Sequence, residues 1–342
     1  MFKPNYTITN KLLGNIKRIG EIVTTLNNLN FPKVVLFEME KRAREISSYS
    51  STSIEGNPLP LTDVKRILKN KPKFIRDSEK EVINYNNALI TLDEYIKKNK
   101  INLTTQLLEK IQKMVTNGLI DKNHLGHIRK EPVFVNNPRT RKTIYLPPEQ
   151  KNVRGMLGEL FLYLKANKKN IDPLILAGIF HKQFVIIHPF IDGNGRTARL
   201  VTKALLAQMG LNTFNLFSFE NYYNKNVSLY FQKVGLSGDY YDIKDKIDFT
   251  LWLEYFTDGI IDELLRVKKE LENEVINPID DLKDYHKKIL EYIKKNGYIT
   301  DKIYSKISNR AKPTRHLDLR KLIKLGLIRK EGKGRATYYK LK

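Results

Sequence analysis

The sequence predicts a mainly α-helical protein, and three observations support this prediction. Apolar residues recur at helical spacing along most of the 342-residue chain. Glycine or proline follows several of these segments, for example at Gly118 and Pro189, where a helix is expected to end. One internal segment, residues 133–145, instead has two short β-prone runs around an Asn-Asn-Pro turn. We therefore expect helices throughout, one β-hairpin, and a separate basic region at the C-terminal end.

The apolar spacing in residues 1–100 predicts four amphipathic helices, which we group as an N-terminal helical region. Proline or glycine follows the first two helices, and a loop rich in lysine separates the last two. In chain order, the helices are expected before Phe31-Pro32, from residue 33 to about 53, and in the two parts of 62–98 around a loop at 69–77.

Residues 101–277 predict a second helical domain that contains the hairpin. Its longest helix holds the only tryptophan, Trp252, and Asn277-Pro278 is expected to break this helix and start a linker. The helices of this domain are expected at residues 103–114, 152–166, 174–187, 197–209 and 248–271.

Residues 279–342 predict three helices followed by a basic β-hairpin, an order that resembles a winged-helix domain. This segment contains 19 Lys and Arg against 7 Asp and Glu, so it carries half of the chain's net charge of +24. Such a charge indicates contact with nucleic acid or a solvated face. In a winged helix the third helix would enter a DNA major groove, although such modules also pack against proteins. Four side chains of this helix are candidates for the DNA contact: Thr314, Arg315, Arg320 and Lys321.

The composition excludes several kinds of site and location. The chain has no cysteine, which excludes disulfides and thiolate metal sites and suits the cytoplasm. No apolar run approaches the length of a membrane span, and the N-terminal residues lack the apolar core of a signal peptide. We therefore expect a cytoplasmic protein with no membrane partner.

Residues 188–199 form the segment on which the functional prediction depends. His188 stands where a buried helix stops, because Pro189 cannot continue it. The turn from Gly193 to Gly195 then leads into another apolar helix. A helix N-terminus presents unpaired N–H groups, and Arg196 and Arg199 add positive charge. The sequence therefore predicts a phosphate site.

The residues next to this phosphate site indicate a reaction. The imidazole of His188 can accept a proton near neutral pH. Asp192 offers a carboxylate to a hard cation such as Mg²⁺. A base, a metal carboxylate and an anion site together suit phosphoryl or nucleotidyl transfer.

This segment resembles the Fic motif, His-x-Phe-x-Asp/Glu-Gly-Asn-Gly-Arg-x-x-Arg, and every fixed position is filled. The resemblance implies a Fic-type helical core in which His188 is the general base and Asp192 holds Mg²⁺ on ATP. It also implies that Arg196 contacts the β and γ phosphates and that Arg199 holds the γ phosphate. Three residues between them, Gly193, Asn194 and Gly195, would cradle the phosphates.

A second resemblance lies before the core. Autoinhibited Fic proteins carry the pattern Ser/Thr-x-x-x-Glu-Gly/Asn, which Ser51, Glu55 and Gly56 match. The resemblance implies that Glu55 pairs with Arg199 and competes with the γ phosphate. A plain helix end is the alternative interpretation of this short pattern.

The hairpin and a tyrosine pair complete the implied site. In Fic proteins a hairpin here, the flap, lies over the nucleotide and pairs its edge with the target protein. The flap covers about Val133 to Tyr145, and Val135 and Asn136 would lie against the nucleotide. Tyr222 and Tyr223 stand where the family has tyrosines near the base, although helical aromatic residues also pack in cores.

The resulting hypothesis is a protein adenylyltransferase that moves AMP from Mg-ATP to a Ser, Thr or Tyr hydroxyl, including its own, under restraint by Glu55. One alternative is a DNA-binding regulator that acts through residues 279–342. Another is removal of AMP from a modified protein by the same core. ATP and a protein target are the expected partners, and a second copy of the chain in a homodimer is a further candidate.

Overall fold

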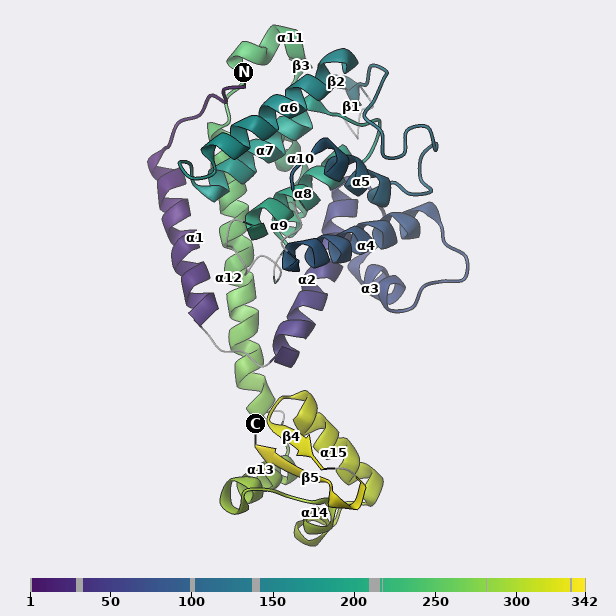
Figure 1. The fold of residues 1–342 in the computed structure, drawn as a ribbon, viewed down its shortest axis with the longest axis vertical. Coiled ribbons are helices and arrows are strands. Elements are labelled where there is room, and N and C mark those ends of the chain that lie inside the picture. The colour runs from purple at the N-terminus through teal and green to yellow at the C-terminus, as the bar shows by residue number, and fades with distance from the viewer. Residues whose placement is uncertain are drawn as a thin grey trace. The chain divides into compact units, whose positions relative to one another are not determined.

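The computed structural model describes residues 2–28, 33–98, 102–136, 142–208, 216, 218–280, 282–332 and 334–341. The fold is mainly helical, as predicted, with a few short strands (Figure 1). The chain divides into two compact units, and each is described separately below. The first comprises Met1–Asn27 and Arg42–Leu265, and the second comprises Asn28–Lys41 and Arg266–Lys342. Within the described residues, no helix combines the length and apolar character needed to cross a membrane.

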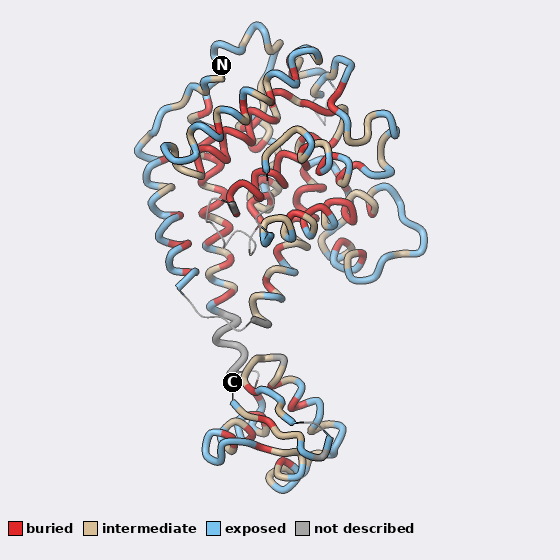
Figure 2. The backbone as a smooth tube through the Cα atoms, in the orientation of Figure 1, coloured by how far each residue is buried: buried red, intermediate tan, exposed pale blue. Residues whose placement is uncertain are grey.

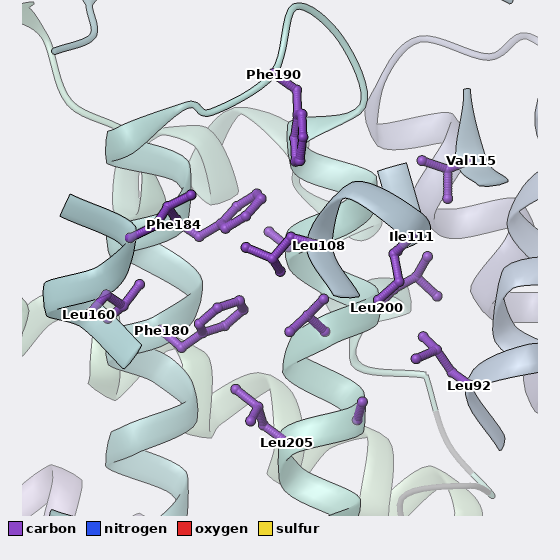
Figure 3. Packing of buried hydrophobic residues seen from close by; sticks show 14 of the residues in the cluster. Leu92, Leu108, Ile111, Val115, Leu160, Phe180, Phe184, Phe190, Leu200 and Leu205 are labelled. Atoms are coloured by element: carbon purple, nitrogen blue, oxygen red, sulfur yellow. The ribbon is translucent and has the colours of Figure 1, made fainter. Parts of the chain in front are cut away.

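Helix α7 (Pro173–Ile187) is the centre of the first unit. It begins where the carboxylate of Asp172 accepts the N–H of Leu174 at 2.8 Å. Nearly all of its residues are buried, because its sequence is apolar on every side (Figure 2). Phe180 and Phe184 pack with Phe190 and with leucines of the neighbouring helices in the core that Figure 3 shows. This rigid core supports both ends of the segment 188–199.

Four helices of the first unit surround α7 or pack against its neighbours. Their bounds are α4 (Asp77–Lys97), α5 (Thr105–Val115), α6 (Gln150–Asn167) and α8 (Asn194–Gln208). Helix α8 begins three residues earlier than predicted. Asn194 and Gly195 therefore belong to its first turn rather than to a preceding loop.

The helices α1 to α4 follow the four amphipathic helices predicted for residues 1–100. Helix α1 buries the predicted apolar stripe, including Ile19, Ile22 and Leu26. The bounds are α1 (Asn10–Asn28), α2 (Lys33–Ile54), α3 (Leu61–Lys69), α9 (Phe219–Lys225), α10 (Val227–Val234), α11 (Tyr240–Ile243), the 3-10 turn η2 (Lys244–Lys246) and α12 (Thr250–Asp280).

Helix α12 corrects one prediction. It does not break at Asn277-Pro278 but continues to Asp280. A proline within a helix removes one N–H donor, and here only the last residues follow it, so little of the hydrogen-bond ladder is lost. At its other end, Trp252 donates its indole N–H to the carbonyl oxygen of Gly178 at 2.8 Å. A side chain at Gly178 would not fit, because a Cβ there would lie 2.6 Å from Leu253.

The predicted hairpin is present as two strands. Strand β1 (Val135–Asn136) pairs antiparallel with β2 (Thr143–Leu146). Strand β2 also pairs, in parallel, with β3 (Gly238–Asp239), so β1 lies at one edge of the three-stranded sheet. The turn at 137–141 lies outside the described residues.

The second unit contains the predicted helices and strands of the tail. Its elements are α13 (Asp284–Asn296), α14 (Asp301–Ile307), α15 (Lys312–Lys324), β4 (Ile328–Glu331), the 3-10 turn η3 (Gly334–Ala336) and β5 (Tyr338–Leu341). Strands β4 and β5 are antiparallel, and the hydroxyl of Thr300 caps α14. Arg315 differs from the expectation that it is free for DNA, because its guanidinium donates twice to Asp301 at 2.9 Å. The identification of this unit as a winged helix stays a prediction.

Candidate active site

His188 ends helix α7 in a left-handed conformation, with φ of 50° and ψ of 60°. Its ring nitrogen Nδ1 lies 3.2 Å from the carbonyl oxygen of Val185. A carbonyl can only accept, so Nδ1 must hold the proton and Nε2 must have the free lone pair. Burial of the ring lowers the pKa of His188 to about 4. The imidazole is therefore neutral at pH 7 and can accept a proton at Nε2.

Arg129 holds the turn at His188. Its Nε donates to the carbonyl oxygen of His188 at 2.8 Å, and its backbone N–H donates to that of Pro189 at 2.9 Å. Other guanidinium nitrogens donate to the carbonyl oxygens of Glu131 and Pro148, which stand on either side of the hairpin. The side chain is almost fully buried, and this burial lowers the pKa of Arg129. Arg129 thus links the position of His188 to the base of the hairpin.

The loop between His188 and α8 is fixed by its own residues. Phe190 is fully buried and anchors the loop in the core. Asn194 accepts the N–H of Phe190 at 2.9 Å and donates to its carbonyl oxygen at 2.8 Å. Gly193 has φ of 82°, and a Cβ there would lie 2.7 Å from Thr116. The side chain of Asn194 is therefore engaged with the loop, and only its backbone N–H remains for a phosphate.

The N-terminus of α8 forms an anion site. The N–H of Thr197 donates to the carbonyl oxygen of Gly193 at 2.9 Å, which closes the first helical turn. The N–H groups of Asn194, Gly195 and Arg196 precede this bond and have no helical acceptor. They point outward at the positive end of the helix dipole, where an anion is favoured.

A carboxylate of the chain lies at this anion site. A Cβ built on Gly195 would lie 2.2 Å from Oε1 of Glu55, so the carboxylate rests directly against the first turn of α8. The same oxygen accepts from Nη2 of Arg199 at 2.6 Å. Ser51 lies one helical turn before Glu55 and accepts two hydrogen bonds from Arg199. Its hydroxyl accepts from Nε at 2.8 Å, and its carbonyl oxygen accepts from Nη2 at 2.9 Å. The structure thus brings Ser51, Glu55, Gly195 and Arg199 together.

The charge of Arg199 is retained although its side chain is fully buried. Burial alone would lower the pKa of Arg199, but the neighbouring Glu55 and tyrosines offset this effect, and the pKa is raised.

Gly56, which follows Glu55, has φ of 98°, and a Cβ there would meet no atom within 4 Å. The chain therefore leaves helix α2 through a left-handed glycine directly after the carboxylate.

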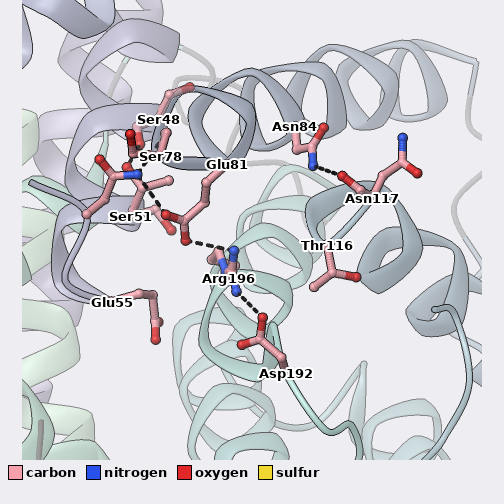
Figure 4. Close-up of polar contacts among 12 residues, drawn as sticks. Ser48, Ser51, Glu55, Ser78, Glu81, Asn84, Thr116, Asn117, Asp192 and Arg196 are labelled. Carbon is pink, nitrogen blue, oxygen red and sulfur yellow. Dashed lines mark hydrogen bonds and ion pairs between the residues drawn. The ribbon is translucent and has the colours of Figure 1, made fainter. Parts of the chain in front are cut away.

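Arg196 lies between two carboxylates (Figure 4). Its Nη1 contacts Glu81 of α4 at 2.7 Å, and its Nη2 contacts Asp192 at 2.8 Å. Sequence reasoning missed Glu81, because no local pattern distinguishes it from the other charged residues of α4.

Asp192 suits Mg²⁺ better than a metal that needs a full cage of protein ligands. Its side chain is about half exposed, and one of its oxygens contacts Arg196. Within the described part of the chain, no group of three or more His, Cys, Asp or Glu side chains could hold a metal. Mg²⁺ is commonly held by one or two carboxylates together with substrate phosphates and water. A single accessible carboxylate beside an anion site fits that requirement.

The tyrosine pair divides between core and surface. Tyr223 is fully buried and stacks on Tyr230, with ring centroids 4.7 Å apart, so in this structure no face of its ring is accessible to a base. Tyr222 is partly exposed and packs against Tyr255 at 5.3 Å. Successive residues of a helix point to different sides, so of these two tyrosines only Tyr223 faces the core.

His181 is a hydrogen-bonding residue of the core. Thr202 donates its hydroxyl proton to the carbonyl oxygen of Ala198, so it accepts from Nδ1 of His181 at 3.1 Å. Nε2 of His181 therefore accepts from the hydroxyl of Tyr230 at 3.1 Å, and that hydroxyl lies 3.4 Å from Arg199. Burial lowers the pKa of His181 well below its usual value, so the ring stays neutral.

In the hairpin, Val135 is partly buried and Asn136 is exposed. Asn136 accepts the hydroxyl of Thr143 at 2.9 Å across the two strands. Phe134, just before β1, exposes 61% of its surface.

The chain is similar to known proteins in sequence and in fold. Residues 102–206 match the family model described as Fic/DOC family. A protein of Nematostella vectensis named "Protein adenylyltransferase Fic" is 30% identical over 173 residues, which cover 47% of this chain and 37% of that protein. A protein of the same name from Culex quinquefasciatus is 30% identical over 221 residues, which cover 58% of this chain and 42% of that protein. The chain therefore spans about two fifths of the length of these curated relatives.

Solved structures show the same fold. A Fic family protein from Desulfovibrio desulfuricans G20 aligns with a TM-score of 0.65 and 20% identity, covering 100% of this chain and 98% of that one. Fic-1 from C. elegans aligns with a TM-score of 0.60 and 20% identity, covering 77% of this chain and 73% of that one.

Proposed function

We propose that this chain, whose residues 102–206 match the model of the Fic/DOC family, is a protein adenylyltransferase. It would transfer AMP from Mg-ATP to a hydroxyl group of a protein and release pyrophosphate. The curated relatives have this name. The observation that carries the proposal is a neutral His188, with Nε2 free, in the same loop as an anion site built from the first turn of α8 and two arginines.

The proposed reaction uses this chain's residues in distinct roles. The hydroxyl oxygen of the target attacks the α phosphorus while Nε2 of His188 takes the hydroxyl proton. The bond from the α phosphorus to the bridging oxygen breaks, and pyrophosphate leaves with that oxygen. Arg196, Arg199 and the N–H groups of α8 stabilise the charge on the phosphates. Asp192 would hold Mg²⁺, which when bound neutralises further phosphate charge.

Glu55 would keep the resting activity low. Its carboxylate lies on Gly195 and pairs with Arg199, so a γ phosphate at the same place would lose its arginine partner and meet a negative charge. The restraint must therefore be relieved before ATP binds productively.

Labelled ATP tests the reaction directly. The purified protein and its Glu55→Gly variant are incubated with Mg²⁺ and ATP labelled at the α phosphate or, separately, at the γ phosphate. Retention of the α label alone on protein is the expected result. Retention of the γ label would instead indicate kinase-like phosphoryl transfer. No retention of either label would contradict AMP transfer and favour removal of AMP from a modified protein.

The target would dock on the flap. Strand β1 is an edge of its sheet, and an exposed edge can pair with an extended segment of another protein through backbone hydrogen bonds. Phe134 offers an exposed apolar contact beside this edge.

The low pKa of His188 predicts the pH dependence of transfer. The ordinary histidine pKa is about 6.5, whereas burial lowers that of His188 to about 4. A base with a lowered pKa loses activity only when the pH falls toward that lower value. The kcat/KM of the Glu55→Gly variant should therefore stay level from about pH 8 to about pH 5.5 and fall below that. An acid limb near 6.5 would contradict a buried His188 as the base.

Binding of DNA by the second unit is a further candidate function. Lys312 and Arg320 of α15 and Lys330 of β4 are exposed on this basic unit. Replacing all three with alanine should weaken binding to a DNA duplex and reduce the slope of log K against log salt by about 2 to 3. Fluorescence anisotropy at several salt concentrations measures both quantities.

A matched variant in the first unit controls for the loss of three charges. Lys165, Lys168 and Lys169 are exposed near the end of α6, and their replacement by alanine should leave the slope unchanged. Equal losses in both variants would mean that DNA is attracted only by the overall charge of the chain.

A further inference from the structure

Glu81 and Asp192, the two carboxylates on Arg196, differ in how firmly they are held. Glu81 lies in the second turn of α4, and its side chain is 15% exposed. Its second oxygen accepts from Nδ2 of Asn57 at 2.7 Å, so both of its oxygens are bonded. The side chain of Asp192 is 47% exposed and belongs to a loop. Glu81 is therefore the fixed partner of Arg196, and Asp192 is the exchangeable one.

Arg196 itself has little freedom. Its side chain is 5% exposed, and its Nε is buried with no hydrogen-bond partner among the described residues. Because Nη1 is bonded to Glu81, Nη2 is the terminal nitrogen that can exchange its partner. A phosphate oxygen could accept from Nη2 in place of Asp192.

Asn57 joins this contact to the restraint at Arg199. Its amide also donates to the carbonyl oxygen of Ser78 at 2.8 Å, and its backbone N–H donates to that of Thr52 at 3.1 Å. It stands two residues after Glu55 and is 8% exposed. The short segment from Glu55 to Asn57 therefore contacts Arg199 at one end and, through Glu81, fixes Arg196 at the other.

We infer that Glu81, held by Asn57, is a positioning residue for the nucleotide's terminal phosphates. It holds the Arg196 guanidinium at the N-terminus of α8 and leaves Nη2 to pass from Asp192 to a phosphate. Glu81 differs in this from Glu55, which is placed to compete with a phosphate. Burial raises the pKa of Glu81, while Arg196 and Asn57 act in the opposite direction and favour its charged form. This inference rests on the proposed use of ATP but not on transfer of AMP to a hydroxyl.

Binding of two nucleotides tests the inference. The parent is the full chain with Glu55→Gly and His188→Ala, so the site is open and no AMP is transferred. Calorimetry measures its affinity for Mg-ATP and for AMP, which lacks the β and γ phosphates. Adding Glu81→Gln keeps the side chain's shape and its contact with Asn57 but removes the charge that holds Arg196. We expect the affinity for Mg-ATP to fall about tenfold or more, because a charge-assisted contact is weakened, and the affinity for AMP to change less than about twofold.

Two further variants complete the experiment. Asn57→Ala should weaken Mg-ATP in the same direction by a smaller factor, because the carboxylate of Glu81 remains. Glu79→Gln is the matched control, since Glu79 is another buried carboxylate of α4 and pairs with Arg76 at 2.9 Å. It should leave both affinities unchanged.

The outcomes separate this inference from the proposed function. Equal losses for Mg-ATP and AMP would show that Glu81 only stabilises the fold, and tighter Mg-ATP binding would show that it competes with phosphate as Glu55 does. Either result would overturn the inference. The selective loss of Mg-ATP affinity would support it even if the labelled-ATP experiment found no AMP transfer. A parent that binds neither nucleotide would overturn both.

Discussion

Replacing His188 with alanine should reduce AMP transfer by about 10²–10⁴-fold, the usual contribution of a positioned general base. The neutral ring has its Nδ1 proton bonded to the carbonyl oxygen of Val185, which leaves Nε2 as the acceptor that the ring can offer. No other group takes this role easily, because His181, which lies within α7, is fully buried and has both ring nitrogens bonded in the core. The initial rate of α-label incorporation, measured in the Glu55→Gly background, gives the factor.

Two variants separate loss of the base from damage to the loop. His188→Asn also lacks the base, but asparagine adopts the left-handed conformation more readily than most residues. It should lose as much activity as His188→Ala while binding ATP normally. His127→Ala removes an exposed histidine and should be fully active. If the asparagine variant kept more than about a tenth of the activity, His188 would not be the base.

Replacing Glu55 with glycine should raise AMP transfer and self-modification by about 10- to 100-fold. A hydrogen bond to a charged group contributes about 1.5–3 kcal/mol, and each 1.36 kcal/mol corresponds to a factor of ten. Under the proposed restraint, ATP displaces the contact between Glu55 and Arg199 in order to bind productively. Removing the contact should therefore strengthen ATP binding by this free energy. The measurement is the initial rate at an ATP concentration well below the KM of the wild-type protein.

Glu55→Gln tests whether charge or bulk restrains the site. It keeps the size of the side chain but removes the negative charge, so it should activate less than glycine and more than the wild type. Glu45→Gln, on the same helix α2 and outside the site, should have no effect. An unchanged rate in Glu55→Gly would mean that the observed contact with Arg199 does not limit ATP binding.

The helices and the main site residues were predictable because their signals are local. Periodic apolar residues predicted α7 and its end at Pro189, since a proline there can only stop the helix. The glycines and arginines that follow predicted an anion site for the same reason, because a helix N-terminus has unpaired N–H groups wherever it occurs. The contact between Glu55 and Arg199 was expected from the family resemblance, and the structure shows that contact.

The missed features depend on contacts between distant segments. Glu81 precedes Arg196 by more than a hundred residues, and only the packing of α4 against α8 makes them partners. Tyr223 stands where the family has a tyrosine near the base, but the packing of α9 places it in the core. No spacing rule within a single segment contains this information.

The way the loop after His188 is held also affects the thermodynamics of nucleotide binding. Asn194 and Arg129 fix its backbone through the chain's own hydrogen bonds, and Gln112 donates to the carbonyl oxygen of Asp192 at 3.1 Å. The loss of conformational entropy that accompanies the ordering of a flexible loop, about 1–2 kcal/mol per residue, therefore occurs when the protein folds and not when ATP binds. Preorganisation of this kind lets more of the interaction free energy with the phosphates stabilise the transition state.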